Sequence, residues 1–222
     1  MNKKGGSSVL KNVVIIGTGG FAREIYGILH SSIGFGTDFI FKCFIEGDVP
    51  ISNERNELLP GPFCGTVLDY IPDKDDVFAM GIADMEAKER IVAIVKSKGG
   101  SFLSLIHKTA LVSEYAKIGE GVVICPYCGI SCNVVIGDHV TINSFSGVGH
   151  DAEIGAFSSI MSHVDITGNV HVGSHTFWGS GSRALPHSKI GSHATIGAGS
   201  VVLKKVKDNQ TVFGVPAKSI YD

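Results

Sequence analysis

Two adjacent residues, His150 and Asp151, have side chains that together could remove a proton from a substrate. They lie in the stretch N-S-F-S-G-V-G-H-D-A-E-I-G, residues 143–155. An imidazole has an ordinary pKa of about 6.5 and can therefore act as a general base near neutral pH. A neighbouring carboxylate can fix its tautomer and stabilise the imidazolium that forms. The pair predicts general-base chemistry, provided that the carboxylate of Asp151 reaches the ring.

The segment around this pair belongs to a periodic array. From Ile118 onward an apolar residue returns every six positions, in a register that does not slip before Val202. The positions are Ile118, Ile124, Ile130, Ile136, Ile142, Val148, Ile154, Ile160, Ile166, Val172, Trp178, Ala184, Ile190, Ile196 and Val202. Such a hexapeptide period indicates a parallel β-helix, in which three units make one coil. An indole is large for the axis, so at Trp178 we expect a bulge or a ring that turns outward.

A period of about eighteen residues per coil sets His150 in a column with residues of the neighbouring coils. The column is Glu114, Cys132, His150, Gly168, Pro186 and Lys204. Its neighbours should lie about 4.8 Å apart, the spacing of adjacent strands. Gly168 leaves its backbone N–H open to a ligand and could donate to a developing oxyanion. Cys132 offers an alternative in which its thiol carries the transferred group, but a direct transfer needs no covalent intermediate, and we favour the direct route.

A glycine-rich turn near the N-terminus is a second candidate site. An apolar, β-branched run ends in Gly17-Thr18-Gly19-Gly20, and a helical pattern follows over residues 21–29. Gly17, Gly19 and Ala22 have the G-x-G-x-x-G/A spacing, in which the backbone approaches a phosphate at a helix N-terminus. The same glycines could also form a tight turn that binds nothing. Taken alone, the spacing would also fit a nucleotide-dependent oxidoreductase.

The first hundred residues predict a small parallel α/β domain. We expect strands from residue 11 and over residues 39–45, 76–81 and 102–106, and an amphipathic helix over 84–98. Glu46 follows the second strand, where an acidic residue often meets a ribose. The expected organisation is a disordered N-terminus (1–10), a Rossmann-like domain (11–106), a β-helix (107–206) and a tail outside the repeat (207–222).

Composition excludes several classes of function. Lys and Arg number 19 against 21 Asp and Glu, so neither nucleic acid nor an anionic membrane is an expected partner.

The five cysteines fit free thiols in an intracellular protein. Cys125-Pro-Tyr-Cys128 lies inside the repeat rather than at the start of a helix, where a redox motif belongs. Among the nine histidines, only His171 and His175 have a spacing typical of metal ligands, and that i,i+4 spacing pairs side chains on a helix but not on a β-helix, so we expect no metal. Since the sequence shows neither a signal peptide nor an apolar run long enough to span a bilayer, we expect a cytoplasmic protein.

Four features in combination resemble a known family. They are I-I-G-T-G-G-F-A-R-E-I (15–25), the hexapeptide array, the segment 143–155, and F-G-V-P-A-K (213–218). Together they resemble the sugar O- and N-acetyltransferases of the sialic acid O-acetyltransferase type, which include nucleotide-aminosugar N-acetyltransferases. The resemblance runs from about Val13 to the end. It implies a nucleotide-sugar-binding α/β domain, a left-handed β-helix, and a homotrimer with active sites between subunits, where acetyl-CoA binds.

The resemblance also implies roles for individual residues. His150 would be the catalytic base and Asp151 its acidic neighbour. Contacts with acetyl-CoA would come from Asn143, Ser159, Gly168, Ser180 and Ala198, of which Ser159 stands where some relatives have a second histidine. The nucleotide sugar would be held by Gly17, Thr18, Gly19, Gly20 and Glu46.

The expected function is acetyl-CoA-dependent N-acetylation of a nucleotide-linked 4-amino-dideoxy sugar in bacterial glycan biosynthesis. Two alternatives remain open from the sequence. One is acetylation of a sugar hydroxyl by the same fold, and the other is a non-catalytic trimer that binds a sugar nucleotide.

Overall fold

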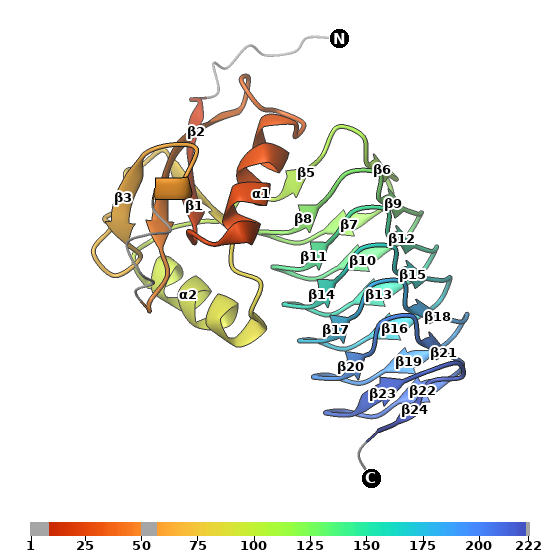
Figure 1. Cartoon of the computed structure of the whole chain (residues 1–222). Helices are drawn as coiled ribbons and strands as arrows, with labels where there is room; N and C mark the ends of the chain where they lie inside the picture. The colour runs from red at the N-terminus through yellow and green to blue at the C-terminus, as the bar shows by residue number, and fades with distance from the viewer. Residues whose placement is uncertain (1–8, 50–56, 221–222) are drawn as a thin grey trace, which may run out of the picture.

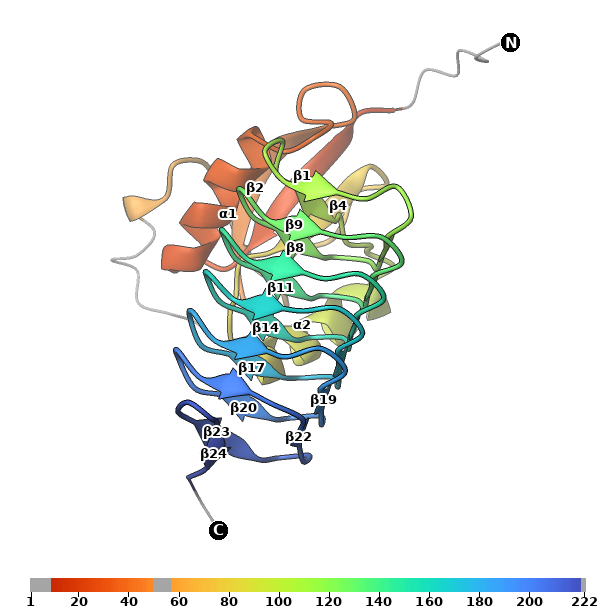
Figure 2. The same cartoon turned by 90° about the vertical axis from the view of Figure 1, so that its right-hand side faces the viewer.

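The computed structural model describes residues 9–49 and 57–220. The chain forms an α/β unit followed by a long parallel β-helix (Figure 1). The view turned by 90° shows the coils stacked along one axis, with the α/β unit beside the earlier coils (Figure 2). Of the N-terminus that was expected to be disordered, residues 1–8 lie outside the described residues.

The α/β unit has three layers. Its elements are β1 (Lys11–Ile16), α1 (Gly20–His30), β2 (Phe39–Glu46), β3 (Phe63–Thr66), β4 (Asp76–Met80) and α2 (Met85–Ser97). The strands form one parallel sheet in the order β3-β2-β1-β4. Side chains alternate along β1, so Val13 and Ile15 pack in one core with α1, whereas Val14 and Ile16 pack in another with α2. The parallel sheet is thus covered on both faces, which confirms the expected α/β class.

The prediction of a fourth strand over residues 102–106 is wrong. The sheet does have four strands, but the one that the sequence did not reveal is β3. It is a short edge strand with exposed Phe63 and Cys64, so it carries no apolar run. Phe102 forms a single bridge to Phe78. Residues Leu105–Ile106 form β5, which pairs with the β-helix. We propose that the boundary between the two units lies just before Leu105, two residues earlier than expected.

The β-helix consists of short strands in three sheets. Sheet I contains β5 (Leu105–Ile106), β8 (Val123–Ile124), β11 (Thr141–Ile142), β14 (Ser159–Ile160), β17 (Phe177–Trp178), β20 (Thr195–Ile196), β23 (Thr211–Phe213) and β24 (Lys218–Ser219). Sheet II contains β6 (Leu111–Val112), β9 (Gly129–Ile130), β12 (Gly147–Val148), β15 (Asp165–Ile166), β18 (Arg183–Ala184) and β21 (Val201–Val202). Sheet III contains β7 (Lys117–Ile118), β10 (Val135–Ile136), β13 (Glu153–Ile154), β16 (His171–Val172), β19 (Lys189–Ile190) and β22 (Lys205–Val206). The predicted axial residues are buried or half-buried, which confirms the hexapeptide interpretation.

Four-residue turns join the sheets at three corners. Corner 1, between sheets I and II, contains residues 125–128, 143–146, 161–164, 179–182 and 197–200. Corner 2, between sheets II and III, contains residues 131–134, 149–152, 167–170 and 185–188. Corner 3 leads back to sheet I through residues 119–122, 137–140, 155–158, 173–176 and 191–194. The third residue of each of these turns has a positive φ, often at Asn, Asp or His. Equivalent turn residues therefore recur in the same conformation from coil to coil.

Trp178 points into the axis, so both expectations for this residue are wrong. Its side chain is fully buried, and Nε1 donates a hydrogen bond to Oγ1 of Thr176 at 3.1 Å. Strand β17 pairs in register with β14 and β20, without a bulge. The next axial residue along the chain is Ala184, whose small side chain leaves room for the indole.

The array is longer than expected at both ends. Ile106 and Val112 continue the six-residue period before Ile118, in β5 and β6. At the other end, the segment predicted to leave the repeat adds β23 to sheet I and buries Val212. Thr211 pairs with Thr195, sixteen residues away rather than eighteen, because the turn after Val202 is shorter. This shortened coil hid the last strands from a strict six-residue count.

Helix α2 fixes the α/β unit to the β-helix. Nζ of Lys88 lies 3.3 Å from both the carbonyl oxygen of His139 and Oγ1 of Thr141. Lys88 is almost completely buried, and burial lowers its pKa to about 8. Glu89 pairs with Nε2 of His175 at 3.1 Å, and Lys96 pairs with Glu120 at 2.6 Å. The candidate sites of the two units therefore belong to one packed framework.

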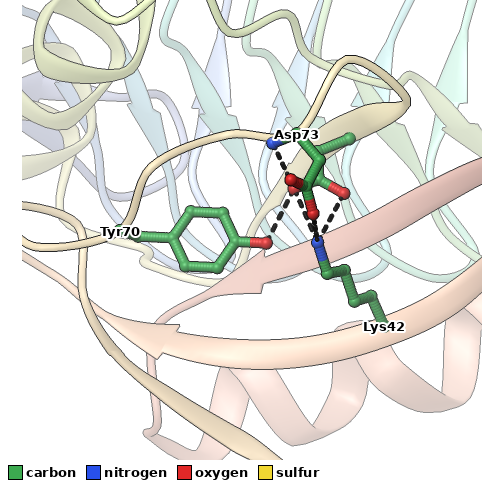
Figure 3. A network of polar contacts seen from close by, with 4 residues as sticks. Lys42, Tyr70 and Asp73 are labelled. Carbon is green, nitrogen blue, oxygen red and sulfur yellow. Dashed lines mark hydrogen bonds and ion pairs between the residues drawn. The ribbon is translucent and has the colours of Figure 1, made fainter.

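A polar network ties β2 to the start of β4 (Figure 3). Nζ of Lys42 donates to Asp73 at 2.7 Å and to both carboxylate oxygens of Asp76 at 2.9 Å. The hydroxyl of Tyr70 and the N–H of Asp73 also donate to Asp76, at 2.7 and 2.9 Å. Burial alone would raise the pKa of Asp76, but these hydrogen bonds outweigh it and hold the pKa below its usual value.

We expect Asp76→Asn to lower the free energy of unfolding by about 1–3 kcal/mol at pH 7, because a buried hydrogen-bonded charge is lost. The folded-state pKa of Asp76 is depressed, so its contribution is complete above the ordinary pKa of about 3.9 and is lost as the pH falls through the lower folded value. Urea unfolding at pH 7 and pH 3 measures this, with Asp73→Asn as the control because the Asp73 side chain is 75% exposed. A difference between wild type and Asp76→Asn that stays constant with pH would contradict the account.

Candidate active site

His150 and Asp151 form a hydrogen-bonded pair at corner 2, in the turn between β12 and β13. Nδ1 of His150 lies 2.7 Å from Oδ2 of Asp151. The contact that the sequence alone left open is therefore present. The pKa of Asp151 is lowered, first by its hydrogen bond with His150 and then by one from Asn133, so the carboxylate stays ionised at neutral pH. When Nδ1–H donates to this carboxylate, Nε2 is left as the basic nitrogen.

Gly168 lies against the His150 ring, one coil further along the column. A Cβ atom on Gly168 would come within 2.7 Å of Nε2 and 2.8 Å of Cε1 of His150. Any larger residue would therefore displace the ring. In the part of the chain that the structure describes, the N–H of Gly168 has no hydrogen-bond acceptor. Corner 2 thus brings a basic nitrogen next to a free backbone donor, which is the arrangement that acyl transfer requires.

The other residues expected at the cofactor lie elsewhere in the chain. Asn143, Ser180 and Ala198 are at corner 1, where Ser180 and Ala198 are exposed. Oδ1 of Asn143 accepts a hydrogen bond from the N–H of Ser144 at 2.7 Å. Ser159 lies in sheet I, only 3% exposed, next to Thr141, which contacts Lys88 of α2. Within one chain, the structure does not bring these four residues to His150.

The cysteines of the β-helix differ in their exposure. Cys132 is exposed one coil before His150, and its Sγ lies 4.0 Å from Oγ of Ser131. The four residues of the Cys125-Pro-Tyr-Cys128 motif form the turn at corner 1 between β8 and β9. Burial raises the pKa of Cys125 to about 12 and also raises that of Cys128. Because the thiolate is the nucleophile, such thiols are poor candidates for redox chemistry at this motif.

The glycine-rich turn lines a cavity of about 350 Å³ in the α/β unit. All five residues expected to hold a nucleotide sugar line it: Gly17, Thr18, Gly19, Gly20 and Glu46. Oγ1 of Thr18 donates to Oε2 of Glu46 at 2.5 Å, and Oε1 of Glu46 accepts from the N–H of Gly47 at 3.1 Å. The cavity lies at the carboxyl ends of β1, β2 and β4, where ligands bind in open parallel sheets.

Arg90 is the charged residue among several lining residues that the sequence reasoning did not identify. Arg90 of α2 lines the same cavity and pairs through Nε with Oδ2 of Asp48 at 3.1 Å. Arg90 lies more than forty residues beyond Asp48, and no local motif marks it, because only the folded position of α2 brings the two together. Among residues 9–49 and 57–220, Arg90 is the one cationic side chain that lines the cavity, in addition to the donors of the glycine-rich turn.

The described ranges contain neither a metal-binding cluster nor a membrane-spanning helix. Among residues 9–49 and 57–220, no cluster of three His, Cys, Asp or Glu side chains could hold a metal ion. Neither α1 nor α2, the two helices of these ranges, is long and apolar enough to cross a membrane.

Comparisons with known proteins agree with this fold. The family described as bacterial transferase hexapeptide (six repeats) matches residues 115–150 and 169–204. A search of curated proteins gave no match. The acetyltransferase domain of PglB from Neisseria gonorrhoeae, in complex with acetyl coenzyme A, is 26% identical, with 95% of this chain and 100% of that chain covered and a TM-score of 0.81.

Two further solved structures are equally similar. WeeI from Acinetobacter baumannii is 26% identical, with 95% of this chain and 100% of that chain covered and a TM-score of 0.83. PerB from Caulobacter crescentus, in complex with CoA and GDP-perosamine, is 28% identical, with 95% of this chain and 98% of that chain covered and a TM-score of 0.83. The chain thus carries the bacterial transferase hexapeptide repeat and, over almost its whole length, is similar to sugar N-acetyltransferases of the hexapeptide-repeat class.

Proposed function

We propose that the protein transfers the acetyl group of acetyl-CoA to the amino group of a nucleotide-linked sugar, of the 4-amino-dideoxy type. The observation that carries this proposal is the position of His150, which is held by Asp151 on one side and lies against Gly168 on the other. The complexes of PglB with acetyl coenzyme A and of PerB with CoA and GDP-perosamine support the same two substrates here.

The proposed reaction is direct acyl transfer. Nε2 of His150 accepts a proton from the sugar amine while the amine nitrogen attacks the thioester carbonyl carbon. The N–H of Gly168 donates to the oxyanion that develops, and Asp151 stabilises the imidazolium. When the tetrahedral intermediate collapses, the new C–N bond remains, the C–S bond breaks, and the proton passes from His150 to the leaving CoA sulfur. No step needs Cys132.

We assign the nucleotide of the acceptor to the cavity of the α/β unit. The N-terminus of α1 at Gly20 opens beside it, and the first N–H groups of a helix together with its dipole attract a phosphate group. Glu46 is the last residue of β2. At the end of the second strand of such folds, an acidic side chain accepts hydrogen bonds from ribose hydroxyls. These features support a diphosphate-linked sugar as the acceptor.

We also propose a homotrimer with its active sites between subunits. The candidate acetyl-CoA contacts Asn143, Ser180 and Ala198 are at corner 1, whereas His150 and Gly168 are at corner 2, on the other side of sheet II. In one chain these residues lie at two different corners, whereas a ring of identical subunits would place corner 1 of one copy beside corner 2 of the next.

The trimer can be tested by mixing two inactive variants. The trimers are assembled at random from His150→Ala chains, whose corner 1 is intact, and Ser180→Trp chains, whose corner 2 is intact. A site is complete when a His150→Ala chain supplies corner 1 and a Ser180→Trp chain supplies corner 2. We expect roughly a quarter of wild-type activity to return after co-refolding, because each site draws on two neighbours. Activity no higher than the sum of the two separate variants would argue against shared sites.

Gly168→Ala should lower kcat by about 100-fold, because its Cβ would push the His150 ring aside and a shift of about 1 Å can cost that much. Gly129→Ala is the matched control, since a Cβ there meets no atom within 4 Å. Steady-state kinetics and thermal unfolding of both variants give the comparison. Equal kcat values in the two variants would remove Gly168 from the proposed site.

The activity itself is tested by the release of free CoA thiol with UDP-, dTDP- and GDP-linked 4-amino sugars as acceptors. Sialic acid serves as the acceptor for hydroxyl acetylation. We expect turnover with a nucleotide-linked amino sugar, a loss of roughly 10²–10⁴-fold in His150→Ala, and most activity retained in Cys132→Ala. Full activity in His150→Ala, or no turnover with any acceptor, would refute the proposal.

A further inference from the structure

We propose that Asn133 is a positioning residue for catalysis, which holds the Asp151 carboxylate in the orientation in which Asp151 orients His150. This inference rests on the proposed role of His150 as the base. Asn133 lies one coil before Asp151 at corner 2, outside the segment 143–155 and outside the column of His150. No local motif in the sequence points to it.

The repeat places Asn133 directly in line with Asp151. Asn133, Asp151 and Asn169 are the third residues of successive turns at corner 2, with φ values of 59°, 58° and 58°. Asn and Asp are enriched in this left-handed conformation because their short polar side chains tolerate it. The shared conformation repeats the direction of the side chain from coil to coil, so the three side chains follow one another along the corner.

The hydrogen bonds join the three groups in series. Nδ2 of Asn133 donates to Oδ1 of Asp151 at 3.0 Å, while Oδ2 of the same carboxylate faces Nδ1 of His150 at 2.7 Å. Each carboxylate oxygen thus has one partner. The amide must present its NH₂ group to the carboxylate, because its own oxygen would repel an ionised acceptor.

Asp151 needs such a tether because it stands at an exposed corner. Its side chain is 45% exposed in the single chain, and a contact between two exposed charged groups orders them only weakly. A single hydrogen bond, to His150, would leave the carboxylate free to rotate about its Cβ–Cγ bond. The second hydrogen bond fixes the carboxylate plane, which keeps Nδ1 of His150 protonated and leaves Nε2 free to accept the substrate proton.

Asn169 provides a matched control on the other side of Asp151. It has the same turn position and the same φ, and its backbone N–H donates to the carbonyl oxygen of His150 at 2.9 Å. Within the described residues, its side chain has no hydrogen-bond partner. Glycine adopts positive φ without strain, so Asn133→Gly and Asn169→Gly remove the side chain but keep the turn.

We expect Asn133→Gly to lower kcat by roughly tenfold, a part of what general-base catalysis contributes, with KM for acetyl-CoA and for the acceptor within about twofold. Asn169→Gly should keep kcat within about twofold, and both variants should have the same Tm. A merely structural role would lower Tm or raise KM in place of kcat. Equal kcat losses in the two variants would overturn the proposal.

A double-mutant cycle tests whether Asn133 acts through Asp151. In an Asp151→Asn background the tethered carboxylate is gone, so Asn133→Gly should have no further effect on kcat. A second tenfold loss in that background would overturn the proposed link.

Nitrogen NMR of the His150 ring separates this inference from the proposed function, because it needs no turnover. The Nδ1-protonated tautomer should predominate in wild type and Asn169→Gly and fall in Asn133→Gly. If the tautomer shifts as expected while no acceptor is acetylated, the positioning role stands and the proposed function fails. An unchanged tautomer in Asn133→Gly would refute the positioning role.

Discussion

The site depends on the hydrogen bonds that link each coil of the β-helix to the next. At corner 2 the N–H of Asp151 donates to the carbonyl oxygen of Cys132 at 3.1 Å, and the N–H of Asn169 donates to that of His150 at 2.9 Å. These bonds set the vertical spacing at about one strand separation. A side chain in one coil can then contact the equivalent turn in the next, as Asn133 contacts Asp151 and Gly168 contacts the His150 ring. A one-residue slip in the register would separate all of these groups together.

The sequence predicts those features that follow from the period. The six-residue spacing places the axial residues, the three-unit coil and the column of His150 as far as Pro186, and the structure bears these out. Lys204 departs from the predicted column, because the turn after Val202 is shortened and Lys205 pairs with Lys189, sixteen residues away. It does not predict whether Asp151 reaches His150, because that depends on the left-handed turn at Asp151 and on the tether from Asn133. The same eighteen-residue step applied to Asp151 rather than to His150 would have pointed to Asn133.

The errors have physical reasons of a different kind. Strand β3 is an exposed edge, so it lacks the apolar run by which β1 is recognised. The expectation for Trp178 considered only the size of its own side chain. Whether the indole fits at the axis also depends on the small side chain of Ala184 in the same coil. The last strands were missed because a coil shortened to sixteen residues still stacks, provided that its Val212 reaches the axis. In each case the deciding partner is distant in sequence, beyond the range of a local pattern.

The chemistry at corner 2 is a choice of side chains on a nearly constant backbone. The turns around Cys132, His150 and Gly168 share one geometry, and their third residues differ in φ by a single degree. The fold therefore provides no special backbone at His150. What distinguishes this coil is its neighbours: an amide before it that reaches the carboxylate, and a glycine after it that leaves space for the ring. A β-helix can thus acquire a catalytic site by changing a few side chains in adjacent coils, because the hydrogen bonds between coils already hold the required spacing.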